Sequence, residues 1–479
     1  MNEKMNDVRK IGRNTFFLWT SQIIFSILAL VLSIFVGRIL GDVAFGKYTF
    51  ANAVPQLLTV FLDLGYTTLL IKEVSRDKSL SDKYLNNTLK FRLILFPVLF
   101  FILFISVNIM GYPESTKNIV YLFGIFVFLR TMSNIFYATF RAFEKMQYEA
   151  AVVTFTTIFR TSAGFVVLLL GYGLMTLGLI FVFSGVLEFV TSLVVCRKKF
   201  VTTKFQVHPS FIRDTIKIAF PLGMLNIFGI IYIRIDTVML SYLKGDAVVG
   251  WYNAAYNLIL GFQFIPQLLM QALLPAMSIY YVSSKESLQK AYEKSFKYLF
   301  ILGLPIAVGI FLLADKFILL FYGNEFINSI IVLQILAWDV LLYFLYTCTG
   351  FVLISTDRQN QMAVIIAFSA ILNFILNLFL IPQYSYIGAG IATLTTEVIL
   401  LIIYLFLNKQ YSSTIKIRET LLPPVIACSI MGIFIYFSSE IQLILRIFIG
   451  IILYMMLLIL LKGFTKNDFL LFKQLIKKN

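Results

Sequence analysis

Apolar runs of about 20 residues, each long enough to cross a hydrocarbon core roughly 30 Å thick, recur along nearly the whole chain. Inside lipid every backbone polar group must be bonded within the protein, so these runs must be helices. The period-2 alternation of a transmembrane barrel is absent from the sequence. We predict fourteen spans, with approximate limits of 15–37, 47–71, 91–110, 119–141, 149–170, 174–196, 215–242, 247–277, 295–314, 327–354, 360–381, 386–408, 420–438 and 442–461.

Lysine and arginine distinguish the two sides of these helices. If the N-terminus is cytoplasmic, 31 of the 40 basic residues fall on the inner side, 6 on the outer side and 3 within spans. Basic residues concentrate on the cytoplasmic side of a membrane. A wrong span count would reverse every later segment, so the asymmetry supports both the count and the orientation. We therefore predict a multi-pass protein of the cell (plasma) membrane with both termini cytoplasmic.

Composition agrees with this pattern. The chain is 59% hydrophobic and 13% charged, whereas soluble domains carry about 25% charged residues. The net charge of +16 suits a nucleic-acid partner in principle, but the alternation between loops favours membrane topology, and we expect no nucleic acid. Cys196, Cys348 and Cys428 lie in apolar runs without metal-ligand spacing. We expect no cofactor and read them as small hydrophobic residues.

An internal repeat divides the chain. Residues 41–48 and 245–252 share the pattern G-D-x-x-x-G-x-Y, each between the first and second spans of a six-span block. Duplicated helical bundles are typical of transporters that bind cargo between the halves. We predict an N-terminal lobe at 1–196, a cytoplasmic linker at 197–214, a C-terminal lobe at 215–408, and two further helices with a basic cytoplasmic tail at 409–479.

Charged residues inside a membrane are costly and usually face a cavity or a partner. Arginine binds phosphate through a planar fork of donors that stays charged. We predict that Arg38, Arg130, Arg160 and Arg234 contribute to a cavity for a phosphate-bearing cargo. The alternative is a set of structural pairs, such as Arg160 with Glu188. The charged residues within the predicted spans are Asp63, Arg130, Arg160, Glu188, Arg234, Asp236, Asp339 and Glu397.

The second half offers oxygen ligands for a cation. Asp236 lies on the seventh span, Asn373 and Asn377 lie four residues apart on the eleventh, and Thr393 lies on the twelfth. Residues four apart share one helix face. These side chains suit Na⁺, although Asn373 and Asn377 could instead join helices by hydrogen bonds. Asp236 could likewise pair with Arg234.

The order of short motifs resembles the oligosaccharide (Wzx-like, O-antigen/polysaccharide) flippases of the multidrug/oligosaccharidyl-lipid/polysaccharide exporter superfamily. The resemblance runs from Lys10 to about Leu407. Its motifs are GRILG at 37–41, GKY at 46–48, FLDLG at 61–65, AFP at 219–221, IDTVML at 235–240, VGWYNAA at 249–255, YGNEF at 322–326, NLFLIP at 377–382 and GAGIAT at 388–393.

The resemblance implies an all-α fold of about 14 transmembrane helices, with two six-helix lobes related by a pseudo-twofold axis plus two C-terminal helices. It implies passage of a lipid-pyrophosphate-linked glycan to the outer leaflet. Related peptidoglycan-precursor flippases bind Na⁺ at places that match Asp236, Asn373, Asn377 and Thr393. They also use the arginine that here is Arg38. Their second arginine falls where this chain has Ala44, which argues against a peptidoglycan precursor as cargo.

We therefore expect a transporter and not an enzyme: a flippase working by alternating access, with Na⁺ or H⁺ as a possible coupling ion. Its partners would be a lipid-linked oligosaccharide, membrane lipids and other polysaccharide-assembly proteins. One alternative is a multidrug/cation antiporter of the same superfamily, whose cavity should be acidic and aromatic. Another is a membrane glycan polymerase or ligase, which would need a large outside loop with acid–base residues. A scaffold without transport would leave the buried charges unexplained.

Overall fold

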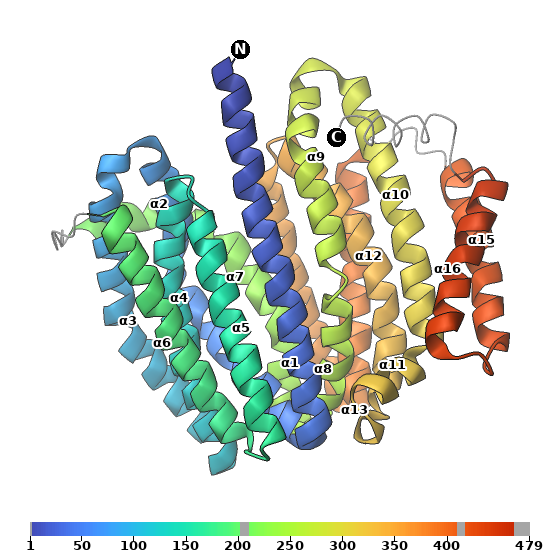
Figure 1. Cartoon of the computed structure of the whole chain (residues 1–479), viewed down its shortest axis with the longest axis horizontal. Coiled ribbons are helices and arrows are strands. Elements are labelled where there is room, and N and C mark those ends of the chain that lie inside the picture. Colours follow the sequence, from blue (N-terminus) through green and yellow to red (C-terminus); the bar gives the residue numbers. More distant parts are fainter. Residues whose placement is uncertain (1, 202–209, 410–416, 464–479) are drawn as a thin grey trace. The chain divides into compact units, whose positions relative to one another are not determined.

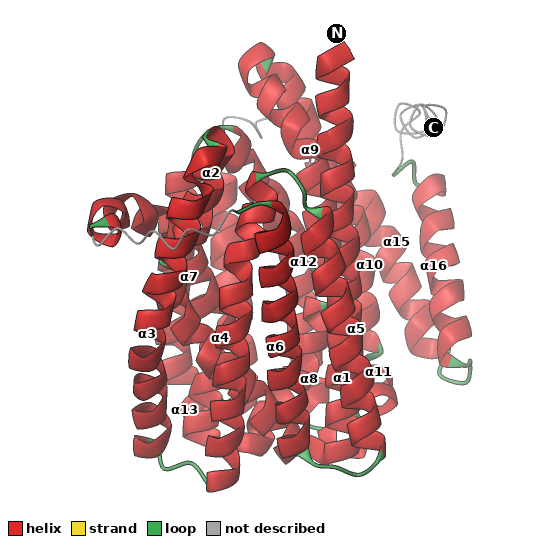
Figure 2. Ribbon diagram, turned by 60° about the vertical axis from the view of Figure 1, so that its left-hand side comes forward, coloured by secondary structure: helices red, strands yellow, loops and turns green. Residues whose placement is uncertain are grey.

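Helices make up nearly all of the chain that the structure describes. The computed structural model describes residues 2–201, 210–409 and 417–463, and Figure 2 shows helices and short loops without a strand in those ranges. The elements are α1 (Asn2–Asp63), α2 (Tyr66–Arg76), η1 (Lys78–Leu80), α3 (Ser81–Ile109), α4 (Glu114–Ala142), α5 (Gln147–Leu169), α6 (Leu174–Lys199), α7 (Phe211–Lys244), α8 (Asp246–Leu260), α9 (Phe264–Ser283), α10 (Lys285–Leu312), α11 (Ala314–Phe321), η2 (Asn324–Phe326), α12 (Ser329–Ser355), α13 (Gln359–Leu407), α15 (Ile417–Phe437) and α16 (Leu443–Leu460).

The fourteen predicted spans are all present. Eleven helical segments of the described residues are long and apolar enough to cross a membrane. Two of these, within α1 and α13, contain a non-helical residue and each cover two predicted spans. The shorter apolar helix Leu421–Phe437 supplies the remaining span. The prediction of an all-α polytopic membrane protein is confirmed.

Local backbone geometry differs from the prediction at one place near the start of the chain. The predicted span 47–71 is interrupted, because Leu64 and Gly65 adopt φ angles of 40° and 85° between α1 and α2. The Asp63 carboxylate accepts hydrogen bonds from the backbone N–H groups of Gly65 (3.3 Å) and Thr67 (3.2 Å). These bonds satisfy donors at the start of α2 that have no partner within the helix.

Residues 1–257 and 366–389 form one compact unit, called unit 1 below. Within it α1 packs against α4 and α5, and α4 packs against α6, so that these helices run side by side in Figure 1. Their core is aromatic: the rings of Phe123 and Phe181 lie 4.8 Å apart, and Tyr48 meets both edge to face. Gly178 on α6 permits close packing, since an added Cβ would lie 2.7 Å from Ile119 Cδ1.

Residues 258–365 and 390–479 form the other compact unit, unit 2, of which residues 410–416 and 464–479 are not described. Helix α10 packs against α12 and α15, and α15 packs against α16. The Tyr454 hydroxyl on α16 donates to the Ile301 carbonyl on α10 at 2.8 Å. The buried Arg446 donates from Nε to the Ile435 carbonyl at 2.8 Å, which holds the α15–α16 hairpin.

The two units do not follow the order of the chain, since unit 1 includes α7 and the middle of α13. The lobes at 1–196 and 215–408 stay a prediction. Residues 202–209 of the predicted linker at 197–214, and the basic tail from residue 464 onward, lie outside the described residues.

Candidate functional site

Arginines and aromatic rings meet in unit 1, on α1, α4, α5 and α6. The Phe25 ring lies 4.6 Å from the Arg130 guanidinium carbon and 5.8 Å from that of Arg160. Arg160 also lies over Phe126 at 5.3 Å and Phe181 at 5.4 Å. Attraction between a cation and an aromatic face is worth about 0.5–2 kcal/mol. These rings therefore hold two like charges close together where solvent is scarce.

Arg160 is only 5% exposed, yet it does not form the pair with Glu188 that was considered as an alternative. Among the described residues, no nitrogen of Arg160 lies within 4.0 Å of a carboxylate oxygen. Glu188 accepts a hydrogen bond from the Tyr137 hydroxyl at 3.0 Å instead. It remains close enough to attract Arg160, while Arg130 is close enough to repel it. The local charge is therefore only partly balanced.

Arg234 on α7 extends this basic region. Its Nε donates to Gln56 Oε1 at 3.0 Å. Arg160 and Arg234 both lie within electrostatic range of the buried Tyr48 hydroxyl. The structure thus brings three of the four predicted arginines into one neighbourhood of unit 1, which we call the arginine cluster: Arg130, Arg160 and Arg234.

Arg38 lies apart from Phe25, the ring that Arg130 and Arg160 share. It is exposed and stands three residues before Gly41. The thirteen residues of helix between Phe25 and Arg38 correspond to about 20 Å. Arg38 therefore does not join the arginine pair on Phe25.

Three of the four predicted cation ligands are in direct contact. Asn377 Nδ2 donates to Asp236 Oδ1 at 2.6 Å and to Asn373 Oδ1 at 2.9 Å. Asp236 is 3% exposed, and both asparagines are fully buried. Thr393 belongs to unit 2 and is also buried. The set of Asp236, Asn373 and Asn377, with its tyrosine partner described next, is called the Asp236 site.

Tyr252 is a member of this site that the sequence analysis did not assign. Its hydroxyl donates to Asp236 Oδ2 at 2.7 Å. The sequence contained a signal that could have identified Tyr252, because this residue ends the second G-D-x-x-x-G-x-Y motif. The first copy ends at Tyr48, beside the arginine cluster. The same motif position therefore serves the basic region in one repeat and the acidic site in the other.

The chemistry of the Asp236 site suits a small hard cation. Such ions take carboxylate and amide oxygens as ligands. Among the described residues, Asn377 Oδ1 is buried without a hydrogen-bond partner, as is Asn373 Nδ2. An oxygen left without a donor beside a buried carboxylate is a position where Na⁺ would be bound. These residues fit Na⁺, with Asp236 as the only full charge among them.

The two copies of the repeat pack against each other. Gly41 and Gly245 have the same backbone conformation, with φ, ψ of 81°, 177° and 87°, 179°. A Cβ on Gly46 would lie 1.7 Å from the Asp246 carbonyl oxygen, and one on Gly250 would lie 2.2 Å from the Asp42 carbonyl oxygen. We call this reciprocal contact of residues 41–48 with 245–252 the repeat contact. Only glycine permits such an approach of two backbones.

One candidate charge has a structural role. Arg92 is fully buried in α3 and forms an ion pair with Asp63. It also donates to the Thr67 hydroxyl at 2.8 Å and to the Thr131 carbonyl. Arg92 lies about three turns after the start of α3, at the beginning of the predicted span 91–110. Asp63 therefore stabilises the fold rather than lining a cargo site.

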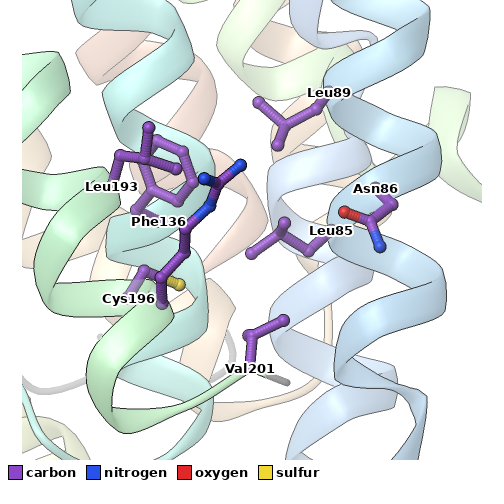
Figure 3. Close-up of a pocket in the computed structure, with 8 residues that line it drawn as sticks. Leu85, Asn86, Leu89, Phe136, Leu193, Cys196 and Val201 are labelled. Carbon is purple, nitrogen blue, oxygen red and sulfur yellow. The ribbon is translucent and has the colours of Figure 1, made fainter. Parts of the chain in front are cut away.

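A small pocket of about 250 Å³, part of it open to solvent, lies between α3, α4 and α6 (Figure 3). Its lining is apolar apart from Asn86 and Arg197, and it includes Phe136 and Cys196. No member of the arginine cluster lines it. It is therefore separate from the basic region described above.

Comparison with known proteins then identifies the family. Residues 11–281 match the model of the polysaccharide biosynthesis protein family, and residues 221–379 match the MatE family. The first match covers more than half of the chain. This protein belongs to the polysaccharide biosynthesis protein family.

Individual relatives are distant. The chain is 23% identical over 254 residues to the probable low-salt glycan biosynthesis flippase Agl15 of Haloferax volcanii, a match that covers 51% of this chain and 53% of the relative. The alignment therefore spans about half of that relative's length. The chain is 19% identical over 405 residues to the capsular polysaccharide biosynthesis protein CapF of Staphylococcus aureus, which covers 83% of this chain and 99% of CapF.

The fold is that of a solved transporter. The structure of the lipid II flippase MurJ in an inward closed conformation superposes with a TM-score of 0.77 at 16% identity, covering 96% of this chain and 99% of MurJ. The predicted polysaccharide family and the predicted fold class are confirmed.

Proposed function

We propose that this protein is a flippase that moves a lipid-pyrophosphate-linked oligosaccharide from the inner to the outer leaflet for glycan export. The observation that carries the proposal is the arginine cluster, in which Arg130 and Arg160 both lie against the Phe25 ring and Arg160 has no ion pair with a carboxylate among the described residues. Positive charge held in a membrane without a matching acid needs an anionic ligand.

The cluster suits a pyrophosphate group. Each guanidinium presents a planar fork of donors that can bond two phosphate oxygens at once. Aromatic faces already hold Arg130 and Arg160 in place, so less conformational freedom is lost when the anion binds. The lipid tail would stay in the bilayer while the glycan crosses with the head group. Arg38, exposed on α1, would contact the cargo at another stage of the passage.

A cation gradient would drive the cycle. Na⁺ or H⁺ would bind at Asp236, Asn373 and Asn377, with Tyr252 bonded to the carboxylate. Thr393 stays a predicted further ligand of the same ion. The lobes at 1–196 and 215–408 would rock by alternating access. Both termini would be cytoplasmic in the plasma membrane, where glycan-assembly proteins could supply the cargo.

The test separates a cargo arginine from a structural one. Arg160→Ala should lower export of surface glycan by about 10- to 100-fold, since it removes one or two hydrogen bonds to a charged group, each worth about 1.5–3 kcal/mol. Arg160→Lys should retain part of the export, because lysine keeps the charge but loses the fork. Membrane abundance should stay normal in both. Arg76→Ala is the matched control, since the Arg76 side chain is 70% exposed.

If Arg130→Ala, Arg160→Ala and Arg234→Ala all export glycan normally at normal abundance, the basic-cluster mechanism is wrong. The MatE match at residues 221–379 then favours a multidrug/cation antiporter. That function predicts export of organic cations such as dyes, which the same variants would leave unchanged.

A further inference from the structure

Two buried carboxylic acids of unit 2 take no part in the sites described so far. Asp339 lies on α12 and is 2% exposed, and Glu397 lies on α13 and is 3% exposed. Both stand well inside long apolar helices, where an acid is costly and usually has a function. Their positions relative to each other follow from the packing of the two helices.

Helix α12 and the second part of α13 run parallel and in contact. A Cβ on Gly390 would lie 3.5 Å from Ile335 Cγ2, and a Cβ on Gly350 would lie 3.3 Å from Tyr404 Cε2. Glu397 lies midway between Gly390 and Tyr404 along α13, so it is level with residues 342–343 of α12.

Asp339 and Tyr343 are four residues apart on α12 and therefore share one face of the helix. Tyr343 is within electrostatic range of both Asp339 and Glu397. Its hydroxyl accepts a hydrogen bond from Gln267 Nε2 at 2.8 Å, which orients the phenol from α9. Asp339 and Glu397 are thus about one helical turn apart in level along the helix axes, and both carboxyl groups are within electrostatic range of the Tyr343 hydroxyl.

Asp339 has no basic partner. Among the described residues it forms no ion pair, and its Oδ1 is buried without a hydrogen-bond partner. A buried carboxylate without a positive partner is unstable and becomes neutral by taking up a proton.

The described helices α9, α12 and α13 contain no lysine, arginine or histidine. After Gly390 the titratable groups of α13 are Glu397 and Tyr404, and on α10 Tyr292 lies near Cys348 of α12. Gly303 of α10 faces Phe344, and the last charged residue of α10 is Lys297, about 9 Å earlier along the helix. On α11 the half-exposed residues Asp315 and Lys316 form an ion pair with each other at 3.2 Å.

We propose that Asp339 and Glu397 form a proton-binding site in unit 2, separate from the Asp236 site in unit 1. The pair holds a shared proton on one carboxyl oxygen and releases it to water when a conformational change hydrates the site. Proton binding stands on the geometry of unit 2 alone, whereas its coupling to transport rests on the proposed flippase function.

The test is infrared difference spectroscopy of the full chain in lipid nanodiscs, titrated with acid and base. At neutral pH the protein should show the C=O stretching band of a protonated carboxylic acid, shifted in heavy water. Asp339→Asn should abolish that band and Glu397→Gln should abolish it or change its position, whereas Asp315→Asn should leave it unchanged. Replacing Na⁺ with choline should have no effect on it.

The proposal fails if the band survives both Asp339→Asn and Glu397→Gln, or if Na⁺ removes it, since the pair would then bind a metal cation. Either variant alone decides the matter if the other does not fold, because both acids hold the same proton. The readout needs no cargo. If the protein shows the band but does not export glycan, the flippase function is rejected and the proton site is supported. If the protein exports glycan normally but shows no band, the proton site is rejected and the flippase function is supported.

Discussion

Buried arginines in this protein are stabilised in three ways. Arg92 pairs with Asp63, Arg446 donates to the Ile435 carbonyl, and Arg160 lies against three phenylalanine rings. The first two arrangements satisfy the guanidinium with groups of the protein itself. The third leaves most of its donors available, which is the arrangement expected of an arginine that receives an anion from outside.

This contrast predicts opposite phenotypes for two buried arginines of unit 1. Arg92→Ala leaves the Asp63 carboxylate in the protein without its ion-pair partner, which should destabilise the fold by about 3–5 kcal/mol. Membrane abundance and thermal stability in detergent should fall together. Arg160→Ala should lower export at normal abundance, so measuring both quantities for both variants tests the assignment. Loss of abundance in Arg160→Ala with none in Arg92→Ala would reverse the two roles.

The Asp236 site predicts ion-dependent stability. Na⁺ that binds only the folded protein should raise its melting temperature, in proportion to the logarithm of its concentration above the dissociation constant. Asp236→Asn removes the only full charge and should abolish this effect. Tyr252→Phe removes only the 2.7 Å hydrogen bond to the carboxylate and should weaken the effect in part.

Tyr242→Phe serves as the control for that experiment, because Tyr242 is 61% exposed. Choline chloride at equal ionic strength separates ion binding from screening. If Na⁺ stabilises the Asp236→Asn variant as much as the unaltered protein, the site does not bind Na⁺.

At the scale of elements, the repeat contact is the feature that joins sequence and structure most directly. Gly46 and Gly250 each meet the backbone of the other motif, and Trp251 Nε1 donates to Asp42 Oδ2 at 2.8 Å. The sequence predicted that the two motifs are copies of each other. It could not predict that they touch, because a duplicated motif indicates equivalent positions and not proximity. The contact joins the two segments that carry Tyr48 and Tyr252.

Adding a methyl group tests the repeat contact. Gly46→Ala and Gly250→Ala would each push one backbone away from the other, since the new Cβ would lie 1.7 Å or 2.2 Å from a carbonyl oxygen. We expect each to lower stability by about 1–3 kcal/mol, as overpacking does. Gly229→Ala on α7 is the matched control, because its Cβ meets nothing within 4 Å and alanine favours a helix. Equal melting temperatures for all three variants would show that the contact is absent in the membrane.

At the scale of the whole molecule, the sequence predicted those features that depend on the order of apolar runs and motifs along the chain. Span number, helical class and family follow from apolar runs and motif order, and they are confirmed. Side-chain partners depend on packing between distant segments, and these were only partly predicted. Asn377 and Asp236 were grouped as cation ligands by residue type and by the resemblance, whereas Phe25 beside two arginines and Tyr252 on Asp236 were not expected. A phenylalanine in an apolar run carries no signal that distinguishes a lipid-facing ring from one that holds a cation.

The last prediction concerns how the chain crosses the membrane. The distribution of 31 basic residues against 6 places Lys285 and Lys409 inside, and Lys117 and Lys244 outside. Single cysteines at these positions, in a chain whose three buried cysteines are replaced, would be treated on intact cells with a membrane-impermeant thiol reagent. We expect labelling at 117 and 244, and at 285 and 409 only after the cells are opened. Labelling of the latter two on intact cells would invert the topology, and the proposed direction of cargo movement would then have no support from charge.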